Sequence, residues 1–335
     1  MTEQALQTSL TQNVTPLEAG AHCVGAYCLA SQPILVMADG RLSLAQSGQT
    51  LITQPHDGAS ILLSCVTSEG VVTAGEDGKL MNTTFDGTTT ELADNKGRWV
   101  DALPAGPSKS LAWSCGKTIF SRDGKGQIRS LEAPSSVRGL SFLPKGYRLA
   151  FSHYNGASLW FPNSEAKPEQ LDWKGSHLDL TVSPDGRFVV TSMQENTLHG
   201  WRLSDKKDMR MSGYPSKVRS LSWSHDGEWL ATSGAEAAVI WPFKEKDGPM
   251  GKPPRECGVR PAKITQVAFH PKALVLAIGY EDNCILLCRL TDAAELLVRR
   301  PVAGEGSITC MAWDQTGKHM VFGTSEGQAG LLTLP

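Results

Sequence analysis

Apolar and polar residues alternate in short runs along this chain, which is the period of β-strands rather than of helices. The clearest unit covers residues 176–205, where Leu178, Leu180 and Val182 are separated by polar residues. A tight turn follows at 183–186, because proline presets φ and the Asp-Gly pair provides the left-handed position. The unit is predicted to form a four-stranded antiparallel sheet with strands at 178–182, 188–191, 198–203 and 208–211.

This unit recurs, and the glycine of its first turn shows the spacing. Gly146, Gly186 and Gly227 follow one another at intervals of about 40 residues. Gly70 and Gly317 each lie about two repeats further out, and the skipped repeats have strand patterns of their own. A repeat of about 40 residues that contains four strands predicts the blade of a β-propeller.

The repeats resemble those of the WD40-repeat β-propellers, over nearly the whole chain. The match is divergent, because Trp160, Trp201 and Trp241 are followed by Phe, Arg and Pro instead of Asp. Asp77 and Asp282 occupy the family's Asp position without a matching Trp, so its tetrad of Asp, His, Ser and Trp is expected to be incomplete in every blade. The segments that carry the resemblance are Ser-Pro-Asp-Gly at 183–186, Ser-His-Asp-Gly at 224–227, Leu-Ala-Thr-Ser-Gly at 230–234 and Val-Ile-Trp at 239–241.

We therefore predict an all-β fold, a closed β-propeller of four-stranded antiparallel blades, with eight blades and seven as the alternative. The last repeat, 307–334, contains three strands, and residues 13–20 offer the missing fourth. Residues 1–12 are predicted to be a mobile segment and residues 13–335 a single propeller domain. The predicted blades cover about 22–55, 61–92, 99–132, 137–173, 177–212, 217–258, 263–300 and 307–334 joined by 13–20.

Composition narrows the classes of function. The chain has 32 Lys and Arg against 34 Asp and Glu, so it has no general electrostatic reason to bind nucleic acid. Its first residues lack the features of a signal peptide, and no apolar run reaches the roughly 18 residues of a membrane span. The eight cysteines are scattered and are expected to be reduced, buried thiols. We expect a cytoplasmic, monomeric propeller.

Motifs for catalysis or cofactor binding are not found. The glycine pairs at 124–126 and 304–306 lack the third glycine and the helix of a dinucleotide-binding loop. Cys284 and Cys288 lie on one predicted strand, about 13 Å apart, which is too far for both to bind one zinc ion. We predict no catalytic residue, no metal and no cofactor; a zinc site assembled from different blades is the open alternative.

Six tryptophans lie within predicted strands, and aromatic side chains in such positions are usually buried. We therefore predict burial between blades for Trp113, Trp160, Trp201, Trp223, Trp241 and Trp313.

Protein partners are expected to dock on loops. The connection from one blade to the next shares a face with the turn between strands two and three, and aromatic and Arg residues are frequent hot spots. Alternatively, Trp173 caps a seam between blades, and Arg138 or Arg219 pairs with an acid such as Asp101 or Glu236. The predicted partner-binding residues are Arg138, Tyr154, Trp173, His177, Tyr214, Arg219 and Tyr280.

Two classes of function compete. The resemblance implies a non-enzymatic scaffold that mediates protein–protein interaction on its loop faces. The alternative is a propeller enzyme or a ligand- or metal-binding protein that uses the central channel. The innermost strands offer Asp101, Asp179 and His177 for such chemistry, and these are too few and too dispersed, so we favour the scaffold.

Overall fold

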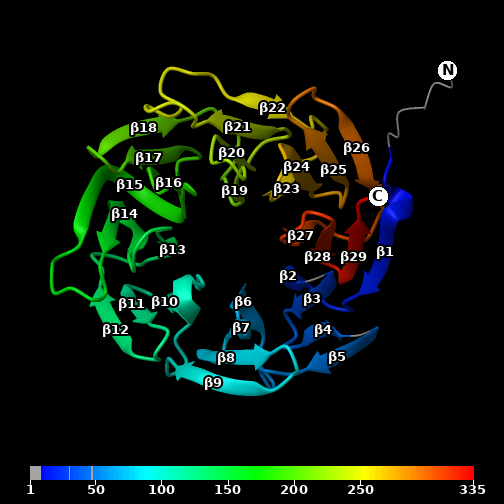
Figure 1. Ribbon diagram of the computed structural model, residues 1–335, viewed down its shortest axis with the longest axis horizontal. Coiled ribbons are helices and arrows are strands. Elements are labelled where there is room, and N and C mark those ends of the chain that lie inside the picture. The colour runs from blue at the N-terminus through cyan, green and yellow to red at the C-terminus, as the bar shows by residue number, and fades with distance from the viewer. Residues whose placement is uncertain (1–8, 30, 47) are drawn as a thin grey trace.

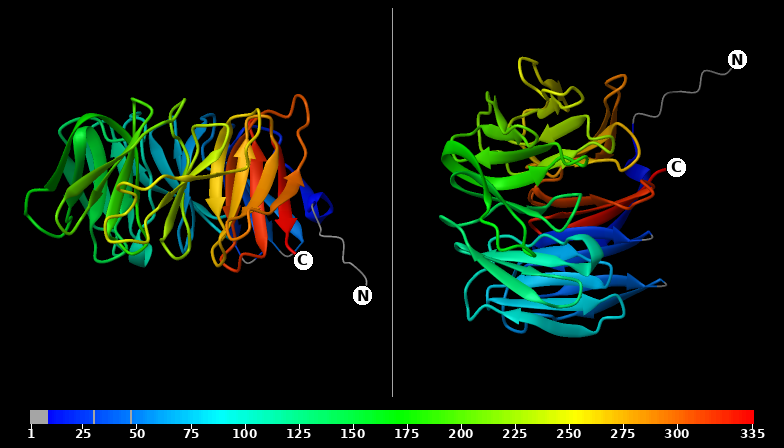
Figure 2. Two further views of the ribbon diagram at one scale, coloured as in Figure 1. Left: turned by 90° about the horizontal axis from the view of Figure 1, so that it is seen from above. Right: turned by 60° about the vertical axis from the view of Figure 1, so that its left-hand side comes forward.

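The computed structural model describes residues 9–29, 31–46 and 48–335. Antiparallel sheets follow one another around a central opening, and views from two other directions show a ring that is flat along the axis of the opening (Figures 1 and 2). Within the described residues, helical structure is limited to two 3-10 segments, η1 (Thr11–Asn13) and η2 (Pro107–Lys109). None of the described helices is long and apolar enough to cross a bilayer.

The sheets follow chain order around the ring (Figure 1). The first three sheets contain β2 (Cys23–Leu29), β3 (Gln32–Met37), β4 (Leu42–Gln46) and β5 (Gln49–Thr53); β6 (Ile61–Val66), β7 (Gly70–Gly75), β8 (Lys79–Thr84) and β9 (Thr89–Asp94); and β10 (Leu111–Cys115), β11 (Thr118–Arg122) and β12 (Ile128–Glu132).

The fourth sheet has six strands: β13 (Leu140–Phe142), β14 (Leu149–Trp160), β15 (Glu169–Val182), β16 (Phe188–Met193), β17 (Leu198–Arg202) and β18 (Lys207–Met211). The remaining three contain β19 (Leu221–Trp223), β20 (Trp229–Thr232), β21 (Ala238–Pro242) and β22 (Arg255–Cys257); β23 (Ile264–Phe269), β24 (Val275–Tyr280), β25 (Ile285–Arg289) and β26 (Glu295–Arg299); and β27 (Ile308–Trp313), β28 (His319–Thr324), β29 (Gln328–Thr333) and β1 (Val14–Glu18).

The prediction of eight blades is wrong, and the alternative of seven agrees with the sheets. The repeats predicted at 137–173 and 177–212 share the six-stranded sheet. Strand β15 causes the merger, because its first part pairs with β14 and its second part pairs with β16. Strand β15 continues without a break through the junction, where Gly175 has a φ of 135°, so the hydrogen-bonded ladder continues from one repeat into the other.

The N-terminal strand β1 is the fourth strand of the last sheet, as predicted. It pairs antiparallel with β29, from Val14 opposite Leu332 to Glu18 opposite Gln328. Residues 1–8 of the predicted mobile segment lie outside the described residues. Its described part is packed, because Leu10 is buried and its N–H donates to the Leu297 carbonyl at 2.7 Å.

The sheets of the ring are not joined by hydrogen bonds between strands, as the strands of a continuous barrel would be. Among the described residues, no strand ladder joins one of the seven sheets to the next. Adjacent sheets meet through apolar side chains, supported by single hydrogen bonds such as the one from Thr309 Oγ1 to the Cys23 carbonyl at 2.6 Å. The expected closure therefore rests on side-chain packing at the seam between the first and last sheets.

The core lies between the sheets, where the tryptophans were expected. Trp113, Trp160, Trp201 and Trp241 are buried, which confirms the prediction for these four. Trp201 packs in a cluster with Leu159, Leu171 and Val189, which brings together residues of two successive repeats. Trp223 and Trp313 are half-buried rather than fully enclosed.

Polar networks inside the sheets are more complete than the sequence indicated. The Nδ1 atom of His56 lies 3.2 Å from Asp77, and its Nε2 atom lies 2.9 Å from Thr73 Oγ1, so three positions of the expected tetrad are filled in the second sheet. In the sheet formed by β19, β20, β21 and β22, Trp241 Nε1 donates to the hydroxyl of Tyr214 in the preceding loop at 2.7 Å. Tyrosine thus takes the place of histidine in that network.

Deletion of residues 1–18 should lower the free energy of unfolding by at least about 2 kcal/mol. The deletion removes β1 together with Leu10, and loss of a single buried leucine side chain costs about 2–5 kcal/mol. Thermal unfolding of the truncated protein would measure the effect. Deletion of residues 1–8 leaves β1 intact and is the matched control; equal melting temperatures for the two deletions would contradict a role of β1 in closing the ring.

Trp201→Ala should lower the free energy of unfolding by about 3–5 kcal/mol, the range for truncation of a large buried aromatic. Trp99→Ala is the control, because Trp99 is 63% exposed and surface changes usually fall within about 0.5 kcal/mol. Denaturant titration of both variants would measure the difference. A cost below about 1 kcal/mol for Trp201→Ala would show that the packing between these repeats is not required.

Candidate functional site

A cavity of about 880 Å³ occupies one mouth of the central opening. Its walls come from innermost strands of separate sheets, among them β2, β6, β23 and β27, which surround the opening in Figure 1. Loops that connect one sheet to the next add residues 215–217 and Lys263. The cavity therefore exists only when the whole ring is assembled.

Bulges in the innermost strands direct side chains into this cavity. The pairing register shifts near the start of β2, β6, β23 and β27, and each shift leaves one residue without an opposite partner. A bulge of this kind bends the strand and re-aims the extra side chain. The four extra residues, Val24, Leu62, Thr265 and Thr309, all line the cavity.

Basic side chains gather on one side of the cavity. We call Arg138, Lys217, Arg219 and Lys263 the basic arc; all four line the cavity and shortly precede the innermost strands β13, β19 and β23. Arg138 is paired with Asp179 at 3.4 Å. Within the described part of the chain, the other three form no ion pair. Most of the charge of the arc is thus not neutralised by the protein.

Two of the seven predicted partner-binding residues belong to the basic arc. Arg138 and Arg219 are exposed and line the cavity. Arg138 pairs with Asp179 rather than with Asp101, whose carboxylate accepts the N–H of Gly116 at 2.7 Å. Tyr154 is 57% exposed and outside the residues that line the cavity.

Trp173 is half-buried, and its ring stacks on His199 with centroids 4.0 Å apart. This contact joins the repeats predicted at 137–173 and 177–212, as the alternative of Trp173 as a cap on a seam between blades would require.

The structure places three further predicted residues, His177, Tyr214 and Tyr280, inside the protein. Tyr280 is fully buried, and its hydroxyl donates to the carbonyl of Gly258. Tyr214 is bonded to Thr232 and Trp241, each at 2.7 Å, and burial raises the pKa of its hydroxyl to about 12. These side chains serve polar networks between strands, so they present no surface to a partner and the prediction needs correction for all three.

His177 is held by two hydrogen bonds, to Thr191 Oγ1 at 2.7 Å and to the Trp173 carbonyl at 3.0 Å. The neighbouring His199 side chain is fully enclosed between Trp173 and Trp201. Neither of its ring nitrogens has a hydrogen-bond partner among the described residues. Burial, helped by His177 and Arg210, lowers the pKa of His199 to about 3, and burial also lowers the pKa of His177.

The cysteines are free thiols, and all but Cys257 are buried. Burial raises the pKa of Cys65 to about 12 and that of Cys284 to about 11, so neither is a ready thiolate nucleophile. The described residues contain no group of three or more His, Cys, Asp or Glu side chains that could hold a metal ion.

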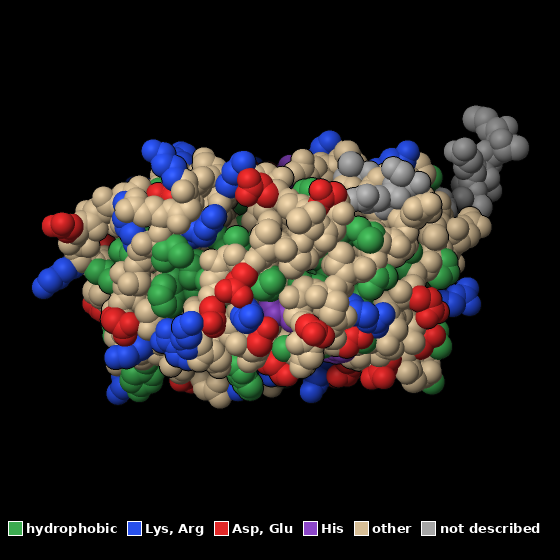
Figure 3. Space-filling view, turned by 90° about the horizontal axis from the view of Figure 1, so that it is seen from below, with side chains coloured by type: hydrophobic (Ala, Val, Ile, Leu, Met, Phe, Trp, Pro, Cys, Tyr) green, Lys and Arg blue, Asp and Glu red, His purple; other side chains and the backbone are tan. Residues whose placement is uncertain are grey.

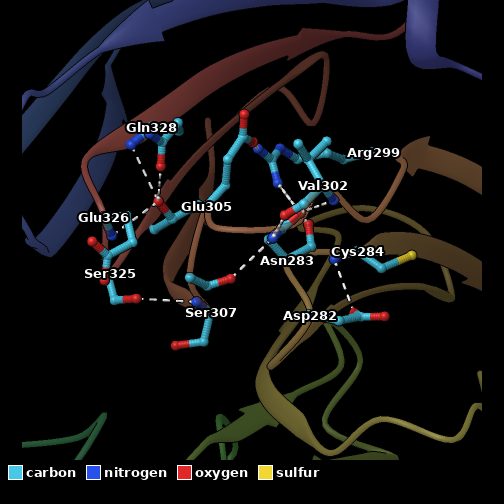
Figure 4. Close-up of polar contacts among 12 residues, drawn as sticks. Asp282, Asn283, Cys284, Arg299, Val302, Glu305, Ser307, Ser325, Glu326 and Gln328 are labelled. Carbon is cyan, nitrogen blue, oxygen red and sulfur yellow. Dashed lines mark hydrogen bonds and ion pairs between the residues drawn. The ribbon is translucent and has the colours of Figure 1, made fainter.

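Asn283 fixes the loop at 302–306, called here the rim loop, which leads into the cavity-lining residue Ser307 (Figure 4). Its side-chain nitrogen donates to the carbonyls of Val302 and Gly306, and its side-chain oxygen accepts the N–H of Val302 at 2.9 Å. Arg299 donates to the same oxygen at 2.6 Å and also contacts Glu305. The rim loop is therefore tied to the sheet by several bonds that meet at one buried side chain.

The outer edge of the ring differs from the cavity in the distribution of its charged side chains. Acidic and basic side chains are mixed along the edge shown in Figure 3, with apolar side chains between them. Pairs such as Lys79 and Glu91, 3.1 Å apart on β8 and β9, neutralise one another. A concentration of unpaired positive charge is thus a property of the cavity and not of this edge.

Sequence reasoning found Arg138 and Arg219 but missed Lys217, Lys263 and the bulged residues. A signal was present, because a basic residue follows a buried valine shortly before two innermost strands, as in Val137-Arg138 before β13 and Val218-Arg219 before β19. The bulges themselves interrupt the period-two alternation, and that interruption is what the pattern did not reveal.

Two family models match parts of the chain. Residues 206–241 match the "WD domain, G-beta repeat" model, and residues 267–334 match the model of the "Anaphase-promoting complex subunit 4 WD40 domain". Among curated proteins, Periodic tryptophan protein 2 of Saccharomyces cerevisiae is 25% identical over 174 residues, which are 44% of this chain and 19% of that protein. THO complex subunit 3 of Arabidopsis thaliana is 20% identical over 163 residues, 48% of this chain and 50% of that protein. The matched stretches thus span at most half of these two relatives.

Solved structures, one of them described as a propeller, share the fold over almost the full length. The computationally designed Ika8 protein superimposes with a TM-score of 0.78 at 16% identity and covers 95% of this chain and 98% of its own. The Dos1 propeller gives a TM-score of 0.75 at 13% identity and covers 98% of this chain and 97% of its own. At these identities the likeness establishes the fold alone.

The free energy of unfolding should decrease as the pH is lowered from about 6.5 toward 3, because the pKa values of His199 and His177 are lowered in the folded protein. In the unfolded chain these histidines bind protons near pH 6.5, whereas folded His199 remains neutral until about pH 3. Protonation therefore favours unfolding. The contribution of these histidines to the free energy of unfolding is fully present above the unfolded-state pKa of about 6.5 and is lost as the pH falls toward the folded-state pKa. Melting temperatures at about pH 7.5 and about pH 5 would measure this dependence.

His199→Gln should make the difference between those two melting temperatures smaller. His225→Gln is the control, because His225 is exposed and its loss should leave the dependence intact. An unchanged difference in His199→Gln would refute the assignment of acid sensitivity to this residue.

Proposed function

Because the chain is a divergent WD40-repeat β-propeller, we propose that it is a non-enzymatic scaffold that binds protein partners at the mouth of its central opening. Propellers of this family carry their interaction surfaces on loops that a rigid ring supports. The proposal includes a monomeric protein in the cytoplasm, which rests on the sequence expectations above.

The basic arc is the observation that supports this face. Four basic side chains, from the repeats at 137–173, 217–258 and 263–300, line one concave surface, and three of them form no ion pair within the described part of the chain. Charged groups that are held without intramolecular partners are available to another molecule. The bonds around Asn283 keep the adjacent rim in place, which reduces the entropy that a partner must overcome on binding.

Catalysis in the opening has less support. The lining has one carboxylate, that of Glu281, and one of its oxygens accepts the backbone N–H of Lys263 at 3.0 Å. His22 is the single histidine among the lining residues. General acid–base or metal-assisted chemistry usually needs several such groups in mutual contact, and the structure does not bring them together here.

Leu62→Trp should weaken partner capture by about thirtyfold or more, because it fills the cavity where hot-spot contacts of at least about 2 kcal/mol are expected. Affinity purification with cross-linking would compare the proteins retained by each variant. Lys125→Trp is the control, because Lys125 lies in the turn between β11 and β12 on the opposite face. Loss of capture in Lys125→Trp with retention in Leu62→Trp would assign binding to that opposite face.

A further inference from the structure

The charge around the cavity indicates the chemistry of the partner. We propose that the basic arc binds an acidic segment of a partner protein, one that presents several carboxylates in an extended conformation. This inference rests on the proposed docking face and adds the class of ligand that the face selects.

The positive charge of the cavity is local. The chain as a whole has a formal net charge of −2, so the cavity does not merely reflect a basic protein. Arg138, Lys217, Arg219 and Lys263 face it, against one lining carboxylate, that of Glu281. Asp179 offsets part of the charge of Arg138 from outside the lining residues. At least two positive charges therefore remain in excess at this surface.

The shape of the cavity strengthens this electrostatic preference. Charges inside a concave surface with low-dielectric walls are screened less by solvent, and the field is focused into the opening. Strands β2 and β6 lie across the opening from β19 (Figure 1) and contribute Val24 and Leu62 to the lining, neither of which carries a charge. An anionic segment would thus be attracted by the basic arc on one side and would meet no carboxylate on the other. This asymmetry would determine the orientation of the segment as well as its affinity.

The lining favours a protein segment over nucleic acid. No Phe, Tyr or Trp is among the residues that line the cavity, whereas single-stranded nucleic acids usually stack on such rings. A cavity of about 880 Å³ is also too small to admit a duplex, whose major groove alone is about 12 Å wide. Carboxylates on an extended peptide recur about every 7 Å on one side, so a single segment can present several of them to the basic arc.

Fluorescence anisotropy with the full chain would test the proposal. The probes are a short Glu-Ser repeat peptide and the same peptide with Gln in place of each Glu. We expect the Glu peptide to bind at least about tenfold more tightly than the Gln peptide, and to lose affinity as salt rises from about 50 to about 300 mM. Equal affinity for the two peptides would overturn the proposal.

A triple variant identifies the residues responsible. Lys217→Gln, Arg219→Gln and Lys263→Gln together should weaken binding of the Glu peptide at least about tenfold. The matched control is Lys125→Gln, Lys145→Gln and Lys318→Gln, which removes the same charge from exposed turns of the opposite face and should leave affinity unchanged. If circular dichroism shows that the triple variant is unfolded, Arg219→Glu alone supplies the test, because a single exposed charge reversal should preserve the fold.

The outcomes separate this proposal from the docking function. If the Glu peptide does not bind but Leu62→Trp abolishes partner capture, acidic selectivity is wrong and docking at the mouth stands. If Leu62→Trp has no effect on capture, docking at this mouth is wrong. If inorganic polyphosphate binds through the arc and the Glu peptide does not, the ligand is a phosphate polyanion and the inference of an acidic protein segment is overturned.

Discussion

Burial between neighbouring sheets is the interaction on which the rest of the structure depends. A small twisted sheet with apolar side chains on both faces cannot shield both of them alone, and within this chain only the sheets beside it can do so. Trp201 shows the consequence, because its contacts come from two successive repeats. Stability is therefore shared around the ring, as expected for repeats in which each unit contacts its neighbours.

The same requirement gives the N-terminal strand its importance. The last sheet begins at β27, and its fourth strand comes from the other end of the chain through the pairing of β1 with β29. The hydrogen bond from Thr309 to the Cys23 carbonyl then joins the first and last sheets at the seam. Since no strand ladder connects the sheets among the described residues, this seam depends on close side-chain packing.

The candidate site follows from ring assembly rather than from any one repeat. Strands β2, β6, β23 and β27 each contribute side chains to the cavity, and the bulged residue of each strand is among them. Four basic residues from the repeats at 137–173, 217–258 and 263–300 line one cavity because the ring arranges these repeats around a common opening. Unpaired charges of this kind add little to stability, which is consistent with a role in recognition.

By itself, the sequence determined the strands, the turns and the repeats, because these depend on local periodicity and on residues such as the Asp-Gly pair at Asp185 and Gly186. It also identified the burial of Trp201 and the place of the N-terminal strand. Only the tertiary structure decided that β15 joins two repeats in one sheet, and that Tyr214 and Tyr280 are buried while Lys217 and Lys263 line the cavity. Local patterns specify which way a side chain leaves its own strand, but burial depends on which neighbouring loops cover it. That covering is settled only when sheets from distant parts of the chain pack around one ring.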